Sequence, residues 1–174
     1  MEPVDFDLIR LIERCIEDVR ASAHDHVISI TFDHETANAM IKADIRRVER
    51  IMRNLLSNAF DHAEDKPINV TVISTRTEVA VGVRDFGTGI EPAALTRIFD
   101  RFWRADPSRA RVRGGTGLGL SIALEDARLH NGELDAWGAL GQGAHFVLTL
   151  PRIAGEQIGG RPIRPNPEDY PQNM

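Results

Sequence analysis

The sequence of 174 residues has one cysteine and no long apolar run. A lone cysteine, Cys15, excludes a disulfide within the chain and fits a reducing compartment. Because Cys15 lies among apolar residues at helical spacing, we expect it to be buried. No segment approaches the ~18–20 apolar residues that a membrane-spanning helix requires. The chain does not start with a basic segment followed by an apolar one, so we expect no secretory signal.

Positive charge is also scarce, because the chain has 21 Lys and Arg residues but 26 Asp and Glu residues, which gives a net charge of -5. Proteins that bind nucleic acid need a basic face to engage phosphates, so we expect no nucleic-acid partner. Neither Lys42 nor Lys66 follows a glycine, which excludes a P-loop. One basic cluster precedes a glycine-rich segment, and we interpret it as facing an anion rather than only solvent: Arg97, Arg101, Arg104, Arg109, Arg111 and Arg113.

Hydrophobic residues make up 42% of the chain, enough for one domain with a core.

Asp44 is the predicted N-cap of a helix. Strands and helices are mixed without strict alternation, which predicts an α+β fold: a two-layer α/β sandwich whose mixed, mostly antiparallel sheet has helices on one face. The apolar spacing predicts helices over 7–20, 44–62 and about 117–130, a short helix after Pro92, and strands over 3–6, 26–32, 68–74, 78–85, 132–137 and 143–150.

The composition changes after Pro151, because five of the nine prolines fall in the last 24 residues. Proline-rich segments with few apolar residues rarely form a packed core. We therefore expect one domain over 1–151 and a proline-rich, disordered tail with little fixed structure over 152–174.

The helix predicted over 44–62 carries two asparagines, Asn54 and Asn58, one turn apart at the border of its apolar face. Their amide oxygens suit a hard cation, and Mg²⁺ needs few protein oxygens because waters and phosphate oxygens complete its shell. On its own, such a pair is common beside an apolar stripe. His62 follows one turn later, where it either reaches a phosphate or is a partly buried structural histidine.

A first glycine-rich segment follows the strand predicted over 78–85. Asp85 begins the sequence Asp-Phe-Gly-Thr-Gly, which contains Gly87 and Gly89 and is followed by Ile90. A carboxylate at a strand end could accept a hydrogen bond from an exocyclic amine such as adenine N6. The glycines would let a flat ring approach the backbone, although a strand followed by a simple tight turn has similar residues.

A second glycine-rich segment precedes the helix predicted over 117–130. Glycines before a helix let consecutive N–H groups converge on an anion, and the helix N-terminus adds a positive dipole. The segment follows an arginine-rich loop rather than the first strand of a βαβ unit, so it differs from a dinucleotide-binding fingerprint. It comprises Gly115, Thr116, Gly117, Leu118, Gly119 and Leu120. With the asparagine pair and the first segment, it predicts a site for a purine, a metal and a triphosphate.

The order of these motifs resembles the ATP-binding domain of sensor histidine kinases, in the superfamily with gyrase B, Hsp90 and MutL and its Bergerat-type ATP-binding fold. The resemblance covers residues 4–150. The stretches 102–109 and 125–130 are further similar to MtrB-type kinases. Four boxes carry it: Asn54 to Ala59 resembles the N box, Asp85 to Gly89 the first G box, Phe99 to Arg104 the F box, and Gly115 to Leu120 the second G box.

This resemblance implies the catalytic domain of a protein histidine kinase in two-component signalling. It implies that Asn58 binds Mg²⁺ and that Asp85 recognises adenine of ATP. Residues 99–115 would form the ATP lid. Asn54 stands where gyrase-like ATPases have a catalytic glutamate, and its amide is no general base, which favours phosphoryl transfer over hydrolysis. The residues lining the nucleotide would be Gly87, Gly89, Ile90, Gly115, Thr116, Gly117, Leu118, Gly119 and Leu120.

The sequence departs from the family at Asp61, where many of these kinases carry Lys or Arg. We therefore expect arginines of the lid to contact the phosphates in its place. The residues assigned to phosphoryl transfer are Asn54, Asn58, His62, Arg104, Arg109 and Arg113.

In this family the histidine that accepts the phosphate lies on a separate dimerisation domain. We therefore expect a monomeric fragment that binds Mg-ATP but does not phosphorylate itself, with the response regulator as an indirect partner. It would belong to the cytoplasmic portion of a membrane-bound kinase without spanning the membrane itself. Three alternatives remain: a nucleotide-binding regulatory module without phosphotransfer, a gyrase- or Hsp90-like ATPase, and a serine kinase of the anti-sigma-factor type.

Overall fold

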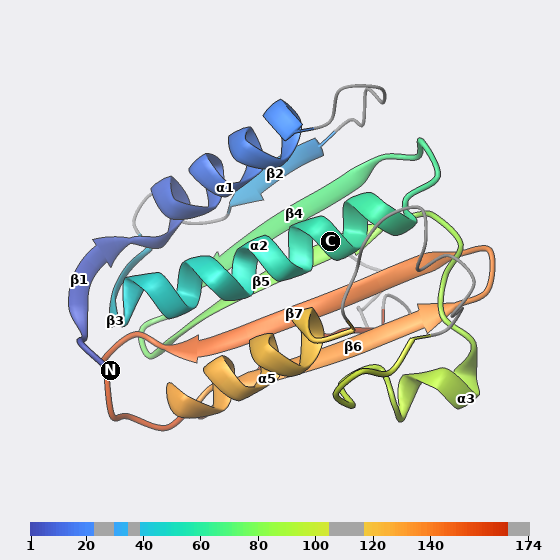
Figure 1. Cartoon of the computed structure of the whole chain (residues 1–174). Helices are drawn as coiled ribbons and strands as arrows, with labels where there is room; N and C mark the ends of the chain where they lie inside the picture. Colours follow the sequence, from blue (N-terminus) through green and yellow to red (C-terminus); the bar gives the residue numbers. More distant parts are fainter. Residues whose placement is uncertain (23–29, 35–38, 105–116, 167–174) are drawn as a thin grey trace, which may run out of the picture.

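The computed structural model describes residues 1–22, 30–34, 39–104 and 117–166 (Figure 1). None of the described helices is both long enough and apolar enough to cross a membrane. The elements follow one another as β1 (Val4–Asp7), α1 (Leu8–Ser22), β2 (Ile30–His34), β3 (Met40–Ala43), α2 (Ile45–His62), β4 (Ile68–Ser74), β5 (Glu78–Asp85), α3 (Pro92–Leu95), α5 (Gly119–Leu129), β6 (Glu133–Ala139) and β7 (Gly143–Pro151).

Five strands form one sheet in the order β2-β4-β5-β7-β6. β4, β5, β7 and β6 pair with their neighbours antiparallel, whereas β2 pairs parallel with β4. Helices α1, α2 and α5 lie side by side across one face of this sheet (Figure 1). β1 and β3 form a separate antiparallel pair. The arrangement confirms the predicted α+β sandwich, with a mixed, mostly antiparallel sheet and helices on one face.

Helix α2 forms where the apolar residues repeat at three- and four-residue spacing. Asp44 caps its first turn, as predicted, because its Oδ1 accepts a hydrogen bond from the Arg47 backbone N–H at 3.3 Å. Asn54 and Asn58 are half-buried at the border of the apolar stripe. The stripe itself is buried and consists of Val48, Ile51, Met52, Leu55, Leu56 and Ala59.

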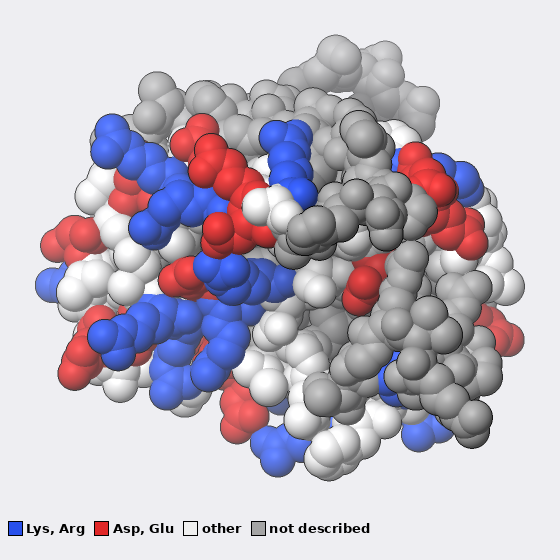
Figure 2. Space-filling model, turned by 45° about the horizontal axis from the view of Figure 1, so that its top comes forward, with Lys and Arg blue, Asp and Glu red and all other residues white. Residues whose placement is uncertain are grey.

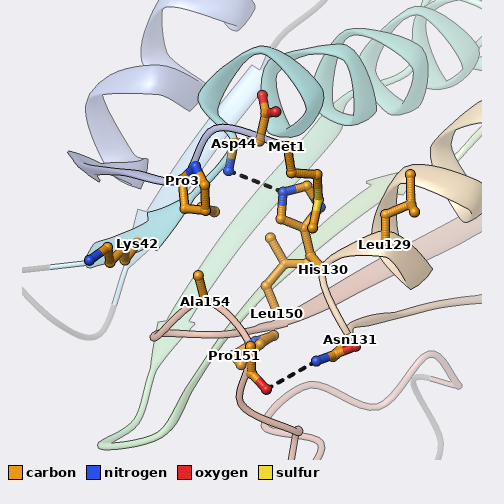
Figure 3. Close-up of a pocket in the computed structure, with 12 residues that line it drawn as sticks. Met1, Pro3, Lys42, Asp44, Leu129, His130, Asn131, Leu150, Pro151 and Ala154 are labelled. Carbon is orange, nitrogen blue, oxygen red and sulfur yellow. Dashed lines mark hydrogen bonds between the residues drawn. The ribbon is translucent and has the colours of Figure 1, made fainter.

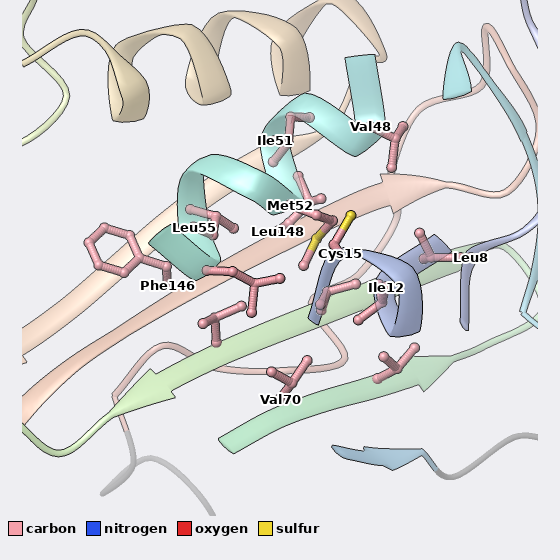
Figure 4. Packing of buried hydrophobic residues seen from close by; sticks show 14 of the residues in the cluster. Leu8, Ile12, Cys15, Val48, Ile51, Met52, Leu55, Val70, Phe146 and Leu148 are labelled. Atoms are coloured by element: carbon pink, nitrogen blue, oxygen red, sulfur yellow. The ribbon is translucent and has the colours of Figure 1, made fainter. Parts of the chain in front are cut away.

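The main core lies between the helices and the sheet (Figure 4). β5 and β7 are buried along almost their whole length, and both have apolar residues on each face of the sheet. Phe146 of β7 meets Phe99 edge to face, with ring centroids 6.4 Å apart. Cys15 of α1 is buried in this core, as predicted, and burial raises the pKa of its thiol to about 11. The thiol is therefore protonated near neutral pH and is no nucleophile.

Some strand boundaries differ from the prediction. The strand predicted over 26–32 appears as β2 over 30–34, and residues 23–29 lie outside the described part of the chain. β3, over 40–43, was not predicted at all. Its four residues alternate between exposed and buried, but four residues are too few to give a clear period in the sequence.

Residues 152–166 differ from the predicted tail with little fixed structure. They pack on the face of the sheet opposite the helices, where Ile163 is 2% exposed and contacts Ala80 and Val147. These two strand residues point away from the main core, because their neighbours along each strand belong to it. The prediction is thus wrong for 152–166, while residues 167–174 lie outside the described chain.

Polar contacts hold the same segment in place. The Gly159 backbone N–H donates to Glu78 Oε1 at 2.6 Å, and the His145 ring donates through Nδ1 to the Pro165 carbonyl oxygen at 2.8 Å. Proline content misled the prediction because proline is also compatible with an ordered, extended segment that forms no strand hydrogen bonds. Proline even reduces the entropy that such a segment loses on folding.

We expect Ile163→Ala to destabilise the protein by about 2–5 kcal/mol, since the substitution leaves a cavity under a buried side chain. Ile153→Ala is the matched control, because Ile153 is 54% exposed in the same segment, and it should cost no more than about 0.5 kcal/mol. Urea unfolding followed by circular dichroism measures both. Equal, small effects would mean that the segment does not pack on the sheet.

Candidate functional site

The site begins at Asp85, the last residue of β5, whose side chain is buried at 1% exposure. Its Oδ1 accepts a hydrogen bond from the Gly87 backbone N–H at 2.9 Å, whereas Oδ2 is buried without a hydrogen-bond partner among the described residues. Burial raises the pKa of Asp85, and the hydrogen bond from the Gly87 backbone only partly opposes that rise. A buried oxygen left open in this way fits a donor supplied by a ligand.

Close backbone contacts surround this carboxylate. A Cβ at Gly87 would stand 1.7 Å from the His62 carbonyl oxygen, and the Thr88 backbone N–H donates to that same oxygen at 3.2 Å. A Cβ at Gly143 would lie 2.1 Å from the Asp85 carbonyl oxygen. Glycine is therefore required here first for the protein's own packing, which brings the end of α2, the end of β5 and the start of β7 together. The sequence alone predicts either room for a flat ring or a simple tight turn at Gly87.

Gly89 and Ile90 lie against β6. Gly89 has a positive φ of 78°, and a Cβ there would come within 1.9 Å of the Ala139 carbonyl oxygen. Ile90 packs over Gly138, where an added Cβ would be 2.7 Å from Ile90 Cβ. The first glycine segment thus crosses from β5 to the edge strand β6 and forms one wall of the site.

The second glycine segment meets the asparagine helix. Gly119 is the first residue of α5, and a Cβ there would lie 3.2 Å from Asn54 Oδ1. Gly117 adopts φ +69°, and its carbonyl oxygen accepts a hydrogen bond from the Phe102 backbone N–H at 3.0 Å. The structure thus brings Asn54 to the N-terminus of α5, with Asn58 one turn further along α2. Leu118 and Leu120 are both half-buried beside them.

His62 has an exposed side chain at the end of α2, so it is not the buried structural histidine of one interpretation. It lies close enough to Asp85 that its charge contributes to opposing the burial-driven rise in the pKa of that carboxyl. This position keeps His62 at the rim of the site.

The structure describes three of the six arginines in the cluster, and two of these three pair with acidic residues of the protein. Arg97 pairs with Asp100 at 3.5 Å, and Arg101 pairs with Glu125 at 3.0 Å, so these two face carboxylates of the protein itself. Arg104 is half-buried at the edge of the described residues. Four further predicted site residues lie outside the described part of the chain: Arg109, Arg113, Gly115 and Thr116.

Among the described residues, no group of three or more His, Cys, Asp and Glu side chains could hold a metal ion. Binding of Mg²⁺ by Asn58 would depend on amide oxygens and on the ligand's own oxygens, and it stays a prediction. A separate pocket lies at the other end of α2, beside Met1, Asp44 and His130 (Figure 3), and contains none of the predicted site residues.

Comparison with known sequences gives one family, described as histidine kinase-, DNA gyrase B-, and HSP90-like ATPases, which matches residues 43–154. The sensor histidine kinase MtrB of Mycobacterium tuberculosis is 45% identical over 161 residues, which are 92% of this chain and 28% of that protein. The signal transduction histidine-protein kinase AfsQ2 of Streptomyces coelicolor is 40% identical over 85% of this chain and 26% of that protein. The chain therefore spans less than a third of the length of these relatives.

Solved structures with the same fold include the catalytic domain of the histidine kinase ThkA in a nucleotide-free form. It has a TM-score of 0.76 and 26% identity, over 88% of this chain and 97% of that domain. Full-length ShkA in complex with AMPPNP has a TM-score of 0.78 and 28% identity, over 89% of this chain and 32% of that protein.

The burial of Asp85 predicts how the free energy of unfolding of the protein without nucleotide depends on pH. Its pKa in the folded state is raised above the ordinary value of 3.8, so ionisation costs stability as the pH rises above that value. At pH 7, Asp85→Asn should therefore have a higher free energy of unfolding than the wild type. The advantage should shrink as the pH is lowered toward 3.8, because both side chains are then neutral.

Urea titrations at several pH values measure this difference. Asp5→Asn is the control, because Asp5 is exposed and its replacement should leave stability nearly unchanged. A lower free energy of unfolding for Asp85→Asn at pH 7 would contradict our interpretation that the buried, charged carboxylate destabilises the folded protein.

Proposed function

Because the chain belongs to the family of histidine kinase-, DNA gyrase B-, and HSP90-like ATPases, we propose that it binds Mg-ATP and donates the γ-phosphate to a histidine on a separate dimerisation domain. It would act as the catalytic module of a sensor histidine kinase in two-component signalling, with the response regulator as a later, indirect partner. The buried Asp85 Oδ2 that lacks a hydrogen-bond partner among the described residues carries the proposal.

Asp85 would recognise the adenine ring. Its Oδ1 is occupied by the Gly87 N–H, which leaves Oδ2 to accept a hydrogen bond from the exocyclic N6 amine. Guanine has an oxygen acceptor at the equivalent position of its ring, which would face the carboxylate with no proton between them. The site should therefore prefer adenine to guanine nucleotides. Ile90, which packs beside Gly138, would provide an apolar surface for the ring.

The phosphates would lie between α2 and the start of α5. The N-terminus of a helix has free N–H groups and a partial positive charge, both suited to an anion. Asn54 lies against this terminus, and Asn58 is one turn further along the same helix. Asn58 would hold Mg²⁺, which neutralises phosphate charge when bound. Arg104, Arg109 and Arg113 of the lid, with His62 at the rim, would contact the phosphates from the other side.

Transfer to a histidine is favoured over hydrolysis by Asn54. Hydrolysis needs a base that takes a proton from water, and an amide does not accept that proton at neutral pH. Transfer asks the protein chiefly to position the triphosphate and to neutralise its charge. A regulatory module that binds nucleotide without transferring phosphate remains the second candidate, since it would need the same adenine pocket.

Isothermal titration with AMPPNP and Mg²⁺ tests the adenine pocket. Asp85→Asn should weaken binding by about ten- to hundredfold, because a hydrogen bond to a charged group contributes about 1.5–3 kcal/mol. Asp135→Asn is the matched control, since Asp135 is half-buried and its carboxylate already pairs with Arg161. If the folded wild type binds no AMPPNP, the proposed function is wrong.

Phosphoryl transfer is tested by mixing the chain with a separately produced histidine-bearing dimerisation domain and γ-labelled ATP. We expect acid-labile label on that domain and none on the chain alone. Asn58→Ala should abolish labelling and remove the dependence of nucleotide binding on Mg²⁺. Rapid phosphate release without transfer would instead support a gyrase-like ATPase, and binding with neither reaction would support the regulatory module.

A further inference from the structure

We propose that Asp126 is a positioning residue for the triphosphate: by holding Arg47 and Arg50 of α2, it fixes the register of α5 and so places the N-terminus of α5 against Asn54. The inference rests on the proposed function, because it concerns how the phosphates of a bound nucleotide are held. None of the four boxes that carry the family resemblance includes this aspartate.

Helices α2 and α5 meet along a seam of polar contacts. At one end the Asp44 backbone N–H donates to His130 Nε2 at 3.1 Å (Figure 3), and at the other Asn54 Oδ1 approaches the Gly119 backbone. Asp126 occupies the middle of the seam. The residue numbers fall along α2 as they rise along α5, so the two helices run antiparallel in a single register.

Asp126 makes the strongest contacts of this seam. Its side chain is 2% exposed and accepts hydrogen bonds from Arg50 Nε at 2.7 Å, Arg50 Nη2 at 2.7 Å and Arg47 Nη1 at 2.8 Å. The two bonds from Arg50 form a planar fork that tolerates little change of angle. Burial would raise the pKa of Asp126, but the two guanidinium groups outweigh it and lower that pKa. The carboxylate is therefore charged near neutral pH.

His130 extends the same constraint to the end of α5. Its Nε2 accepts from Asp44, so Nδ1 carries the proton and donates to the Asp126 carbonyl oxygen at 2.7 Å. The ring thus joins the cap of α2 to the last turn of α5. Asp126 is linked to α2 both through its own side chain and through this histidine.

Helical spacing connects these contacts to the phosphate site. Asp126 follows Gly119 by seven residues, close to two turns, so both lie on the same side of α5. On α2, Arg50 precedes Asn54 by four residues, about one turn. A slide or rotation of α5 that moved Gly119 away from Asn54 would therefore also separate Asp126 from its arginines.

The buried side chains of α5 define this register only weakly. Those other than Asp126 are small (Ser121, Ala123 and Ala127), while the larger Leu120 and Leu124 pack against the core but are only partly buried. Small side chains interlock weakly and permit a helix to shift along its neighbour. The ion pairs with Asp126 are therefore the directional contacts that select one position.

Three of the four arginines of α2 pair with carboxylates of the protein and are therefore not free cations for the nucleotide. Figure 2 shows basic side chains gathered with acidic ones on the part of the surface where the first half of α2 lies in Figure 1. Arg47 and Arg50 both engage Asp126, and Arg53 engages Glu49 and Asp18 on the side facing α1. Asp126 thus acts on the phosphates indirectly, because it fixes the position of α5 relative to α2.

The test compares the nucleotide AMPPNP, which has phosphates, with the nucleoside adenosine, which has none. Asp126→Asn should weaken the binding of AMPPNP by about tenfold, since a misplaced phosphate site loses affinity, while adenosine binding stays within about twofold because Asp85 is untouched. Titration calorimetry measures AMPPNP, and NMR chemical-shift titration measures adenosine. Asp18→Asn is the matched control, because it removes an Asp–Arg pair between α1 and α2 instead. It should change neither affinity.

Arg50→Lys provides a second variant if Asp126→Asn does not fold. It retains the charge but loses the planar fork, and it should weaken AMPPNP by a smaller factor, with adenosine again unchanged. Parallel losses for both ligands, or no loss for either, in a folded variant would overturn the positioning role. A folded wild type that binds neither ligand would instead mean that the proposed function has failed.

Discussion

The carboxylate of Asp85 is held below the protein surface with one oxygen bonded to Gly87 and the other open among the described residues. Such an oxygen costs free energy, so the surrounding structure must hold it rigidly. It does so because β5 lies between β4 and β7 in the sheet, and because Gly87 and Gly143 let three backbone segments meet without side chains between them. A strand that is buried along almost its whole length therefore ends in the carboxylate that we propose recognises the ligand.

The helical layer provides the other half of the site. α2 is anchored to the core by its apolar stripe and presents Asn54 and Asn58 at the border of that stripe. α5 has a much smaller buried face, and its first residue is brought to Asn54 along a polar seam with α2. The proposed site for adenine thus depends on the sheet, and the proposed site for phosphates depends on how the two helices align.

Much of this could be predicted from the sequence because the signals were local. The amphipathic period of residues 45–62 is long enough to define α2 almost to the residue, and the glycine motifs and Asp85 stand out without any structure. The four residues of β3 are too short to show a period. The reason for Gly87 is a contact with His62, which is distant in sequence and visible only in the fold. The pairing of Asp126 with Arg47 and Arg50 is equally non-local.

The segment over 152–166 also has a practical meaning for where this folding unit ends. The family match stops at residue 154, yet Ile163 is the side chain that shields Ala80 and Val147 from water. A chain cut at the family boundary would expose a strip of apolar strand surface on the far side of the sheet. Such a strip favours self-association. A recombinant version intended to stay monodisperse should therefore keep these residues, and a fusion partner is better joined after them than before them.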